Sequence, residues 1–361
     1  MKICVLGTRG FPLIQGGVEK HCESLYTEFP AEYRFVIFRR KPYVRVTPSY
    51  PNITFIDLPS TKIKGFEAVY HSFLSTCRAV LSRPDIVHIH NIGPALFSPL
   101  LKLCGIKVVL TYHSPNYEHK KWGWGVRTLL KWSEKIALRM SDAVIFVNKF
   151  QLEKYDERTR SKSYYIPNGI PRITPATQQN YIRELGLTPG KYVLGVGRIT
   201  PEKGFDCLEK AFAGVDTDYK LVIAGGVETE SAYLDELKSI LPPEKIVFTG
   251  YVYGEKLNQL YTHAGLYVLS SYNEGFPLVL LEAMSYGLDV LVSAIPASHL
   301  VDLPADDYFS KGDYEELARK IERKLKYPRQ QKYELEAYDW TAIVKRLAAV
   351  YDKLNGRKQV P

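Results

Sequence analysis

Short apolar runs of strand length recur along this chain, and segments with helical periodicity separate them. In the first half these runs are residues 35–38, 86–90, 108–110 and 143–147. A second alternating series begins at Tyr192 and closes near Tyr327. Strands that alternate with helices are typical of parallel sheets covered by helices on both faces. The alternation therefore predicts an α/β fold.

The length of the chain indicates more than one domain. At 361 residues it exceeds what one hydrophobic core usually organises, and 45% hydrophobic residues supply ample core material. The stretch from Pro167 to Pro175 is rich in Pro and Gly and then turns polar, which suits an interdomain connection. We therefore predict one domain over 1–170 and a second over 171–339, followed by a last helical segment within 340–361.

Two carboxylates, Glu274 and Glu282, flank an apolar run that begins with Gly275 and Pro277. Residues 266–270 read as a short buried strand, and Pro277 suits the first turn of a helix, where no free N–H is needed. Glu274 is thus predicted in a loop and Glu282 on a helix. The start of such a helix attracts phosphate, and the carboxylates can accept hydrogen bonds from sugar hydroxyls and a ribose diol. The spacing alone also fits a turn with two satisfied surface carboxylates.

A second strand, glycine turn and helix extends from Tyr192 to Asp206, with two cations in the turn. Arg198 offers a planar fork and Lys203 a flexible point charge, so the pair can hold a diphosphate that gains charge as its bond to a sugar breaks. Two solvated surface cations are the alternative. The glycines here do not complete the dinucleotide-binding pattern, and the chain has no Walker phosphate loop.

A third glycine turn, Gly16 and Gly17, lies between the opening apolar strand and a helical pattern from Val18 to about Glu28. Glycines at this place let backbone N–H groups come close to a phosphate. The pair also fits a simple tight turn.

These motifs and their order resemble the retaining, nucleotide-sugar-dependent glycosyltransferases of family 4, over most of the chain. The most specific element is the pair Glu274 and Glu282 with seven residues between them. Supporting segments are 166–170, 221–226 and 247–252. The resemblance implies the GT-B fold, in which two Rossmann-like doubly wound domains face a central cleft. It also implies that the helix within 340–361 returns to the first domain.

The resemblance implies roles for single residues. Arg198 and Lys203 would grip the donor diphosphate, Glu274 would hold the transferred sugar, and His113 would face the donor sugar and the acceptor. A histidine after a strand also fits a purely structural role. The residues implied in donor binding are Gly16, Gly17, Arg198, Lys203, Tyr251, Val252, Glu274, Gly275, Phe276, Pro277, Leu278 and Glu282.

The family mechanism implied is transfer with retention of anomeric configuration. The chain has no Asp-x-Asp pair placed to bridge a divalent ion to a diphosphate, so the positive charge is expected from Arg198, Lys203 and helix ends. His88 and His90 share one face of a strand-like segment, but no carboxylate or cysteine cluster accompanies them, which argues against a metal site. We expect no metal and no cofactor besides the nucleotide-diphosphate sugar, which is a co-substrate.

Charge is distributed unevenly along the chain. Residues 1–170 contain 25 Lys and Arg against 13 Asp and Glu, whereas the remainder contains 23 against 26. Within 117–132, three tryptophans are interleaved with Lys120, Lys121, Arg127 and Lys131, which predicts a surface that lies on an anionic membrane. Nucleic acid is the competing partner, but none of its usual binding motifs occurs. The alternative is that the tryptophans are core residues and the lysines a solvated face.

No run approaches the roughly 20 apolar residues of a membrane-spanning helix, and no signal-peptide pattern follows the first strand. The five cysteines are scattered and odd in number, which fits reduced thiols. The expected location is the cytoplasm, with peripheral attachment to the inner face of the plasma membrane.

The expected acceptor is a saccharide or lipid-linked saccharide, as in the assembly of bacterial surface polysaccharide. Two other classes of function stay open. A non-catalytic glycosyltransferase-like subunit would bind a partner, although the presence of Arg198, Lys203, Glu274 and Glu282 argues against it. A GT-B epimerase would turn over without an acceptor, and a GT-B phosphorylase would depend on inorganic phosphate.

Overall fold

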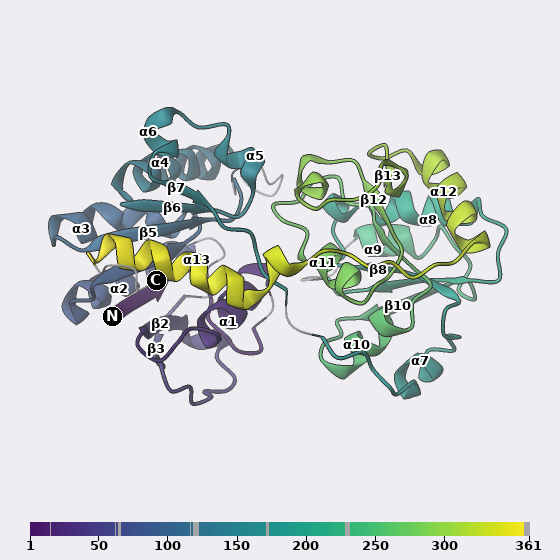
Figure 1. Cartoon of the computed structure of the whole chain (residues 1–361), viewed down its shortest axis with the longest axis horizontal. Helices are drawn as coiled ribbons and strands as arrows, with labels where there is room; N and C mark the ends of the chain where they lie inside the picture. Colours follow the sequence, from purple (N-terminus) through teal and green to yellow (C-terminus); the bar gives the residue numbers. More distant parts are fainter. Residues whose placement is uncertain are drawn as a thin grey trace. The chain divides into compact units, whose positions relative to one another are not determined.

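The computed structural model describes residues 1–14, 16–61, 63, 66–115, 117, 123–170, 173–227 and 232–356. The chain divides into two compact units (Figure 1). Unit 1 comprises Met1–Gly169 together with the segment that begins at Glu336, and unit 2 comprises Ile170–Leu335.

In the described part of unit 1, seven parallel strands form one sheet in the order β3-β2-β1-β4-β5-β6-β7. Their bounds are β1 Lys2–Leu6, β2 Arg34–Arg40, β3 Ile53–Leu58, β4 Ile86–His90, β5 Lys107–Tyr112, β6 Ala143–Phe146 and β7 Ser163–Tyr165. The central strands are buried on both faces, which explains why they read as continuous apolar runs.

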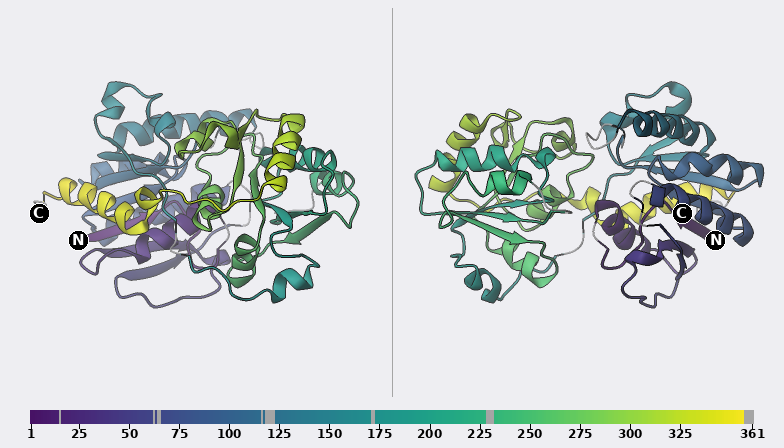
Figure 2. Two further views of the ribbon diagram at one scale, coloured as in Figure 1. Left: turned by 45° about the vertical axis from the view of Figure 1, so that its right-hand side comes forward. Right: turned by 180° about the vertical axis from the view of Figure 1, so that it is seen from behind.

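Helices cover both faces of this sheet. On one face lie α1 (Gly17–Thr27) and α13 (Trp340–Leu354), and on the other α2 (Phe66–Ser82), α3 (Ser98–Leu103) and α4 (Trp124–Met140). Accordingly, α13 lies in front of the sheet in Figure 1 and behind it in the right-hand view of Figure 2. The short helices α5 (Lys149–Leu152) and α6 (Glu157–Arg160) precede β7.

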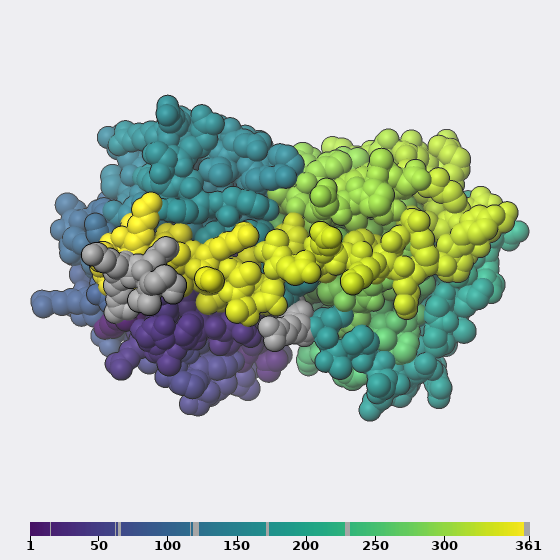
Figure 3. Space-filling view, viewed as in Figure 1, coloured from purple at the N-terminus to yellow at the C-terminus, as the bar shows by residue number. Residues whose placement is uncertain are grey.

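The helix α13 belongs to the core of unit 1 although it follows the whole of unit 2 in the sequence. Its residues Trp340, Ile343, Leu347 and Tyr351 are buried in the same cluster as residues of α1 and β1. In Figure 3 its yellow side chains lie between the purple and teal residues of unit 1. Asp339 caps its start, because its carboxylate accepts a 2.8 Å hydrogen bond from the backbone N–H of Thr341.

Unit 2 has a six-stranded parallel sheet within its described residues, in the order β10-β9-β8-β11-β12-β13. The strands are β8 Tyr192–Val196, β9 Lys220–Ala224, β10 Ile246–Gly250, β11 Leu266–Leu269, β12 Val290–Ser293 and β13 Tyr308–Phe309. The helices are α7 Asn180–Glu184, α8 Phe205–Ala213, α9 Ala232–Leu237, α10 Glu255–Thr262, α11 Leu278–Ser285 and α12 Tyr314–Lys326. The predicted α/β fold with two Rossmann-like domains is confirmed.

Each sheet has a point at which the strand order reverses, between β1 and β4 in unit 1 and between β8 and β11 in unit 2. In open parallel sheets, ligands bind outside the carboxyl ends of the strands at such a point. The loops that follow these four strands are therefore the places to look for a site. No helix among the described residues is both long and apolar enough to cross a bilayer.

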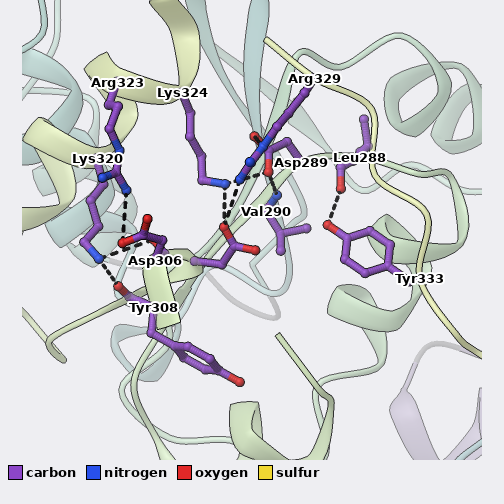
Figure 4. Close-up of polar contacts among 11 residues, drawn as sticks. Leu288, Asp289, Val290, Asp306, Tyr308, Lys320, Arg323, Lys324, Arg329 and Tyr333 are labelled. Carbon is purple, nitrogen blue, oxygen red and sulfur yellow. Dashed lines mark hydrogen bonds and ion pairs between the residues drawn. The ribbon is translucent and has the colours of Figure 1, made fainter. Parts of the chain in front are cut away.

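A buried ion network links the residues directly before β12 and β13 to α12 (Figure 4). The ammonium of Lys324 lies 2.5 Å from a carboxylate oxygen of Asp289 and 2.6 Å from one of Asp307. All three side chains are at most 5% exposed, whereas Arg329, which approaches the same two carboxylates at 3.4 and 3.6 Å, is half exposed. Lys324 is therefore the buried counter-ion of two buried carboxylates.

Glu209 on α8 introduces a pH dependence into the stability of unit 2. It is fully buried, and neither carboxylate oxygen has a hydrogen-bond partner among the residues that the structure describes. Burial, with a smaller effect of the Asp206 charge, raises the pKa of Glu209 from 4.5 to about 8. The folded state thus binds a proton that the unfolded state releases near pH 4.5, so this group makes stability fall as pH rises from about 4.5 to about 8.

We expect Glu209→Gln to remove most of this pH dependence, because the amide carries no charge at either pH. At pH 8 the variant should melt higher than the wild type, by on the order of 10 °C, and at pH 4.5 the two should be close. Thermal unfolding at both pH values measures this. Glu315→Gln, at an exposed position of α12, is the control and should keep the wild-type profile. An identical pH profile for Glu209→Gln and the wild type would contradict the assignment.

Candidate active site

Lys203 and Glu274 meet at the strand-order reversal of unit 2. Lys203 ends a short 3-10 turn, Pro201–Lys203, after β8, and Glu274 lies in the loop after β11. The Nζ atom of Lys203 lies 2.5 Å from Oε1 of Glu274, which also accepts a 2.7 Å hydrogen bond from the hydroxyl of Ser271. The two side chains of the pair are 18% and 10% exposed. The contact is thus a largely buried, charge-assisted hydrogen bond between residues 71 positions apart.

Backbone contacts hold the two loops together. The Ser270 hydroxyl donates to the carbonyl of Lys203 at 3.0 Å, and the N–H of Tyr272 donates to the carbonyl of Glu202 at 2.8 Å. Gly204 has a φ of +62°, and a Cβ at that position would lie 2.2 Å from the Ser270 carbonyl oxygen. The sequence needs glycine at 204 because only glycine permits both the conformation and the close approach.

Glu282 lies inside α11, as predicted, and its carboxylate is partly engaged by the protein itself. The residue is 7% exposed, and Oε2 accepts a 3.0 Å hydrogen bond from the hydroxyl of Tyr261 on α10. Burial, with a smaller contribution from the Glu282 charge, raises the pKa of Tyr261 well above its ordinary value, so the phenol stays a donor. Sequence reasoning missed Tyr261, since a tyrosine near the end of a helix carries no signal of this contact.

The start of α11 differs from the prediction by one position. Pro277 is the N-cap, with φ −83° and ψ 77°, and the helix begins at Leu278. The Leu278 N–H donates to the Phe276 carbonyl at 3.0 Å, which holds Phe276 to Leu278 in a tight turn directly before the first helical residues. Pro277 is therefore the central residue of this turn instead of a residue of the first helical turn, and Gly275 lies in the same loop as Glu274.

The loops after β8, β9 and β10 are adjacent. The N–H of Ile199 donates to the Gly226 carbonyl at 3.0 Å, and a Cβ on Gly226 would lie 3.3 Å from Cβ of Tyr251. Arg198 is exposed at this edge, Tyr251 is half exposed, and Val252 is partly buried beside it. The structure thus brings Arg198 and Tyr251 onto neighbouring loops of one sheet edge.

In unit 1, Gly16 is the N-cap of α1 and Gly17 is the first helical residue. Gly16 has a φ of +148°, and a Cβ there would lie 2.0 Å from a carboxylate oxygen of Glu19. Glu19 is buried and accepts a 3.1 Å hydrogen bond from the backbone N–H of Arg9. Gly16 is required because the Glu19 side chain folds back over it. Gly17 is exposed, and a Cβ added to it would have no described atom within 4 Å.

His113 follows β5 and is partly buried. Its Nε2 lies 3.0 Å from Nδ1 of His90, and Nε2 of His90 lies 2.7 Å from the hydroxyl of Tyr26. Burial lowers the pKa of His113 well below its ordinary range, with smaller effects of His21 and His88, so the ring is neutral near pH 7. His113 therefore offers one donor and one acceptor and carries no charge.

The hydrogen-bonded chain continues from Tyr26 into the core of unit 1. Nδ1 of His88 lies 3.0 Å from the Tyr26 hydroxyl and 2.5 Å from that of Tyr351 on α13, and its Nε2 lies 2.7 Å from the Thr111 hydroxyl. His88 and His90 are both fully buried. The two strand histidines thus belong to one polar network within a hydrophobic core.

The predicted site residues fall into two groups, one in each unit. In unit 2 the structure joins Lys203 directly to Glu274. It places Arg198, Tyr251, Val252 and Gly275–Leu278 on loops or a helix start that follow strands of the sheet, and Glu282 inside α11. In unit 1, Gly16, Gly17 and His113 follow β1 and β5. Ser271, Tyr261, His90 and Tyr26 are the partners that sequence reasoning missed.

Two protein families match this chain, one in each half. The family model "Glycosyltransferase Family 4" matches residues 15–172, and the model "Glycosyl transferases group 1" matches residues 177–340. The sulfoquinovosyl transferase SQD2 of Arabidopsis thaliana is 27% identical over 301 residues, which are 73% of this chain and 56% of that protein. The chain thus spans little more than half the length of this relative.

Two solved structures share the fold over nearly the whole chain. A sucrose-phosphate synthase from Thermosynechococcus elongatus superposes with a TM-score of 0.80 at 22% identity, covering 98% of this chain and 99% of the other. The Anabaena protein HepE in complex with UDP and glucose superposes with a TM-score of 0.77 at 18% identity, covering 98% and 100%. Because both units carry matches, this chain belongs to glycosyltransferase family 4, the glycosyl transferases group 1, with the GT-B fold.

Proposed function

We propose that this glycosyltransferase moves a sugar from a nucleotide-diphosphate sugar to a saccharide or lipid-linked saccharide, with retention of anomeric configuration and without a divalent metal. The observation that carries the proposal is the buried Lys203–Glu274 pair at the strand-order reversal of unit 2. A carboxylate and an ammonium held at one edge can serve the two ends of such a donor, since the ammonium attracts the diphosphate and the carboxylate accepts hydrogen bonds from sugar hydroxyls.

The order of events follows from this pairing. An arriving diphosphate competes with Glu274 for the Lys203 ammonium and frees a carboxylate oxygen to accept from a sugar hydroxyl. Arg198 and Lys203 then stabilise the charge that grows on the leaving diphosphate as an oxocarbenium-like centre forms. The acceptor hydroxyl attacks from the face that the diphosphate leaves, and its proton passes to the departing phosphate oxygen.

The remaining site residues take supporting roles in the proposal. Glu282, which already accepts from Tyr261, also accepts from the ribose, and Tyr251 and Val252 lie against the base. The segment Gly275–Leu278 presents its backbone to the sugar, and Gly16, Gly17 and His113 keep in this proposal the binding roles that the family resemblance implies. No cofactor is needed, since the nucleotide-diphosphate sugar is itself a substrate.

A panel of nucleotide-diphosphate sugars with saccharide and lipid-linked acceptors tests this function. We expect acceptor-dependent release of nucleoside diphosphate, a product with the anomeric configuration of the donor by NMR, and a rate within about twofold of the original after treatment with EDTA, because Arg198 and Lys203 supply the positive charge. Turnover without an acceptor would identify an epimerase, and dependence on inorganic phosphate a phosphorylase. Nucleotide binding without turnover on any donor would indicate a non-catalytic subunit.

We further propose that unit 1 lies on the anionic inner face of the plasma membrane through α4, where a lipid-linked acceptor for surface polysaccharide is assembled. Trp124 and Trp132 on α4 are 84% and 64% exposed, so the reading of these tryptophans as core residues is wrong. Lys120, Lys121 and Trp122 lie outside the described residues. The exposed side of α4 also carries the cations Arg127, Lys131, Lys135 and Arg139. Exposed tryptophans beside cations suit the boundary between headgroups and acyl chains.

Vesicles that contain phosphatidylglycerol test this attachment. We expect Arg127→Gln with Lys131→Gln to weaken co-sedimentation by about 25-fold in partition coefficient, because each cation near an anionic surface contributes about 1 kcal/mol. Arg158→Gln with Arg160→Gln, at exposed positions of α6, removes the same charge elsewhere in unit 1 and should bind as the wild type does. Equal losses in both double variants, or no wild-type binding at low salt, would end the membrane proposal.

A further inference from the structure

Three imidazoles from three elements of unit 1 converge on one point. They belong to His21 on α1, His90 at the end of β4 and His113 after β5, and one nitrogen from each lies within 4.8 Å of the other two. His21 and His90 are 4% and 0% exposed, whereas His113 is partly exposed. The cluster is therefore buried on two sides and open toward solvent at His113.

The spacing of the rings fits a tetrahedral ion. The ring centroids of His21 and His113 are 5.0 Å apart, those of His90 and His113 5.4 Å, and those of His21 and His90 5.7 Å. Three imidazoles that each hold a zinc ion through a nitrogen at about 2.0–2.1 Å have centroids about 5.2 Å apart. The 3.0 Å between Nδ1 of His90 and Nε2 of His113 needs to open by only about 0.3 Å to match that geometry.

Asn168 and Trp340 lie against the His21 ring. The Asn168 side chain is a hydrogen-bond partner of the His21 imidazole. Trp340 packs against the same ring with centroids 5.5 Å apart. Both neighbours restrict the orientation of the His21 ring, as the surroundings of a metal-binding histidine usually do.

The surroundings fix His90 in the orientation that a ligand needs. Its Nε2 is held by the Tyr26 hydroxyl at 2.7 Å, so Nδ1 is turned toward His113 and the cluster. Tyr26 is in turn held by His88 at 3.0 Å. A hydrogen bond to the second ring nitrogen is the usual support of a metal-binding histidine, since it sets the tautomer and the ring orientation.

We propose that His21, His90 and His113 bind one divalent transition-metal ion, with zinc preferred. Imidazole suits Zn²⁺, Cu²⁺ and Ni²⁺, whereas Mg²⁺, Ca²⁺ and Mn²⁺ prefer oxygen ligands, and the described cluster has no carboxylate. The sequence argued against a metal at His88 and His90 because no other ligand stands near them in the chain. The fold supplies the other two ligands from α1 and from the loop after β5, and it leaves His88 outside the set.

A metal on Nε2 of His113 withdraws that residue from the sugar and the acceptor. Zinc is therefore an inhibitor of transfer that acts from unit 1, a consequence that rests on the proposed function. The binding of the ion does not depend on that function. Experiments can therefore contradict the metal site without contradicting the proposed function, and the reverse.

The test uses the full chain without a polyhistidine tag, freed of metal by a chelator. We expect Zn²⁺, titrated against a chromogenic chelator, to bind with a stoichiometry of one per chain, and Co²⁺ to give the absorption bands of a tetrahedral site. His21→Gln and His90→Gln should each weaken zinc binding by about 100-fold, comparable to the larger effects of disturbing a metal site. His299→Gln, which changes an exposed histidine of unit 2, should leave binding unchanged.

Stability gives a second measurement that does not depend on enzymatic activity. Bound zinc should raise the melting temperature of the wild type and of His299→Gln, and should leave that of His21→Gln unchanged. Substoichiometric zinc binding in the wild type, or equal binding in His21→Gln and His299→Gln, would overturn the proposal. If zinc binds as expected and transfer continues at full rate, the metal site stands and the role of His113 in transfer falls.

Discussion

Lys203→Ala and Glu274→Ala will each lower kcat/KM for sugar transfer by about 10²- to 10³-fold. In the proposed mechanism Lys203 supplies one of the cations that stabilise the departing diphosphate, and removal of a single preorganised group from such a site typically costs this much. Glu274 holds Nζ of Lys203 at 2.5 Å, and in the proposed mechanism it also orients the sugar. Initial rates of nucleoside diphosphate release over a range of donor concentrations measure the loss for each variant.

Two further variants separate chemistry from folding. Either single substitution leaves a largely buried charge without its partner, so some loss of stability is expected. The double variant Lys203→Ala with Glu274→Ala removes both charges and should regain stability, as judged by thermal unfolding, while it remains inactive. Lys191→Ala, which breaks an exposed ion pair with Asp218, is the matched control and should retain wild-type kinetics. Recovery of transfer in the double variant would show that the pair is structural only.

Lys324→Met should destabilise unit 2 by about 3–5 kcal/mol, because it leaves the carboxylates of Asp289 and Asp307 buried without their counter-ion. Oδ2 of Asp307 already lacks a partner among the described residues, and the half-exposed Arg329 that would remain beside the two carboxylates is a poor replacement for a buried ammonium. Equilibrium unfolding in urea, followed by circular dichroism, gives the free energy of unfolding. The expected change is a large fraction of the stability of an ordinary domain.

The half-exposed Arg329 provides the control for this prediction. It approaches the same two carboxylates at 3.4 and 3.6 Å, but solvent screens its charge, so Arg329→Met should cost less than about 1 kcal/mol. Adding Asp289→Asn and Asp307→Asn to Lys324→Met should recover part of the lost stability, since amides are cheaper to bury than charges. Similar losses for Lys324→Met and Arg329→Met would mean that burial does not decide the strength of these contacts.

The sequence was sufficient where local pattern decides the structure. The predicted strand 86–90 is β4, and the predicted helix Trp340 to Leu354 is α13. Both depend on residues close together in the sequence: an apolar pattern in each, and in α13 also the N-cap residue Asp339. The position of Pro277 shows the limit of such reasoning. Its φ suits a first helical turn, but the tight turn from Phe276 places it one residue earlier.

Contacts between distant residues required the fold. β8 and β11 are parallel neighbours, so the loops that follow them lie side by side and Lys203 contacts Glu274. The amino-acid composition does not reveal which strands are neighbours. Asp289, Asp307 and Lys324 are residue types that normally lie at the surface, so nothing in the chain indicated that they are buried. The histidine cluster has the same cause, since β4, the loop after β5 and α1 each supply one ring.

The return of α13 to unit 1 has a consequence for biosynthesis. Unit 2 is one continuous stretch, whereas unit 1 lacks Trp340, Leu347 and Tyr351 of its core until α13 has been translated. On the ribosome, unit 2 can therefore fold before unit 1 is complete. Until α13 packs against it, unit 1 exposes apolar surface of the kind that chaperones bind. A nascent chain released before position 340 would therefore yield a folded unit 2 attached to an unfinished partner.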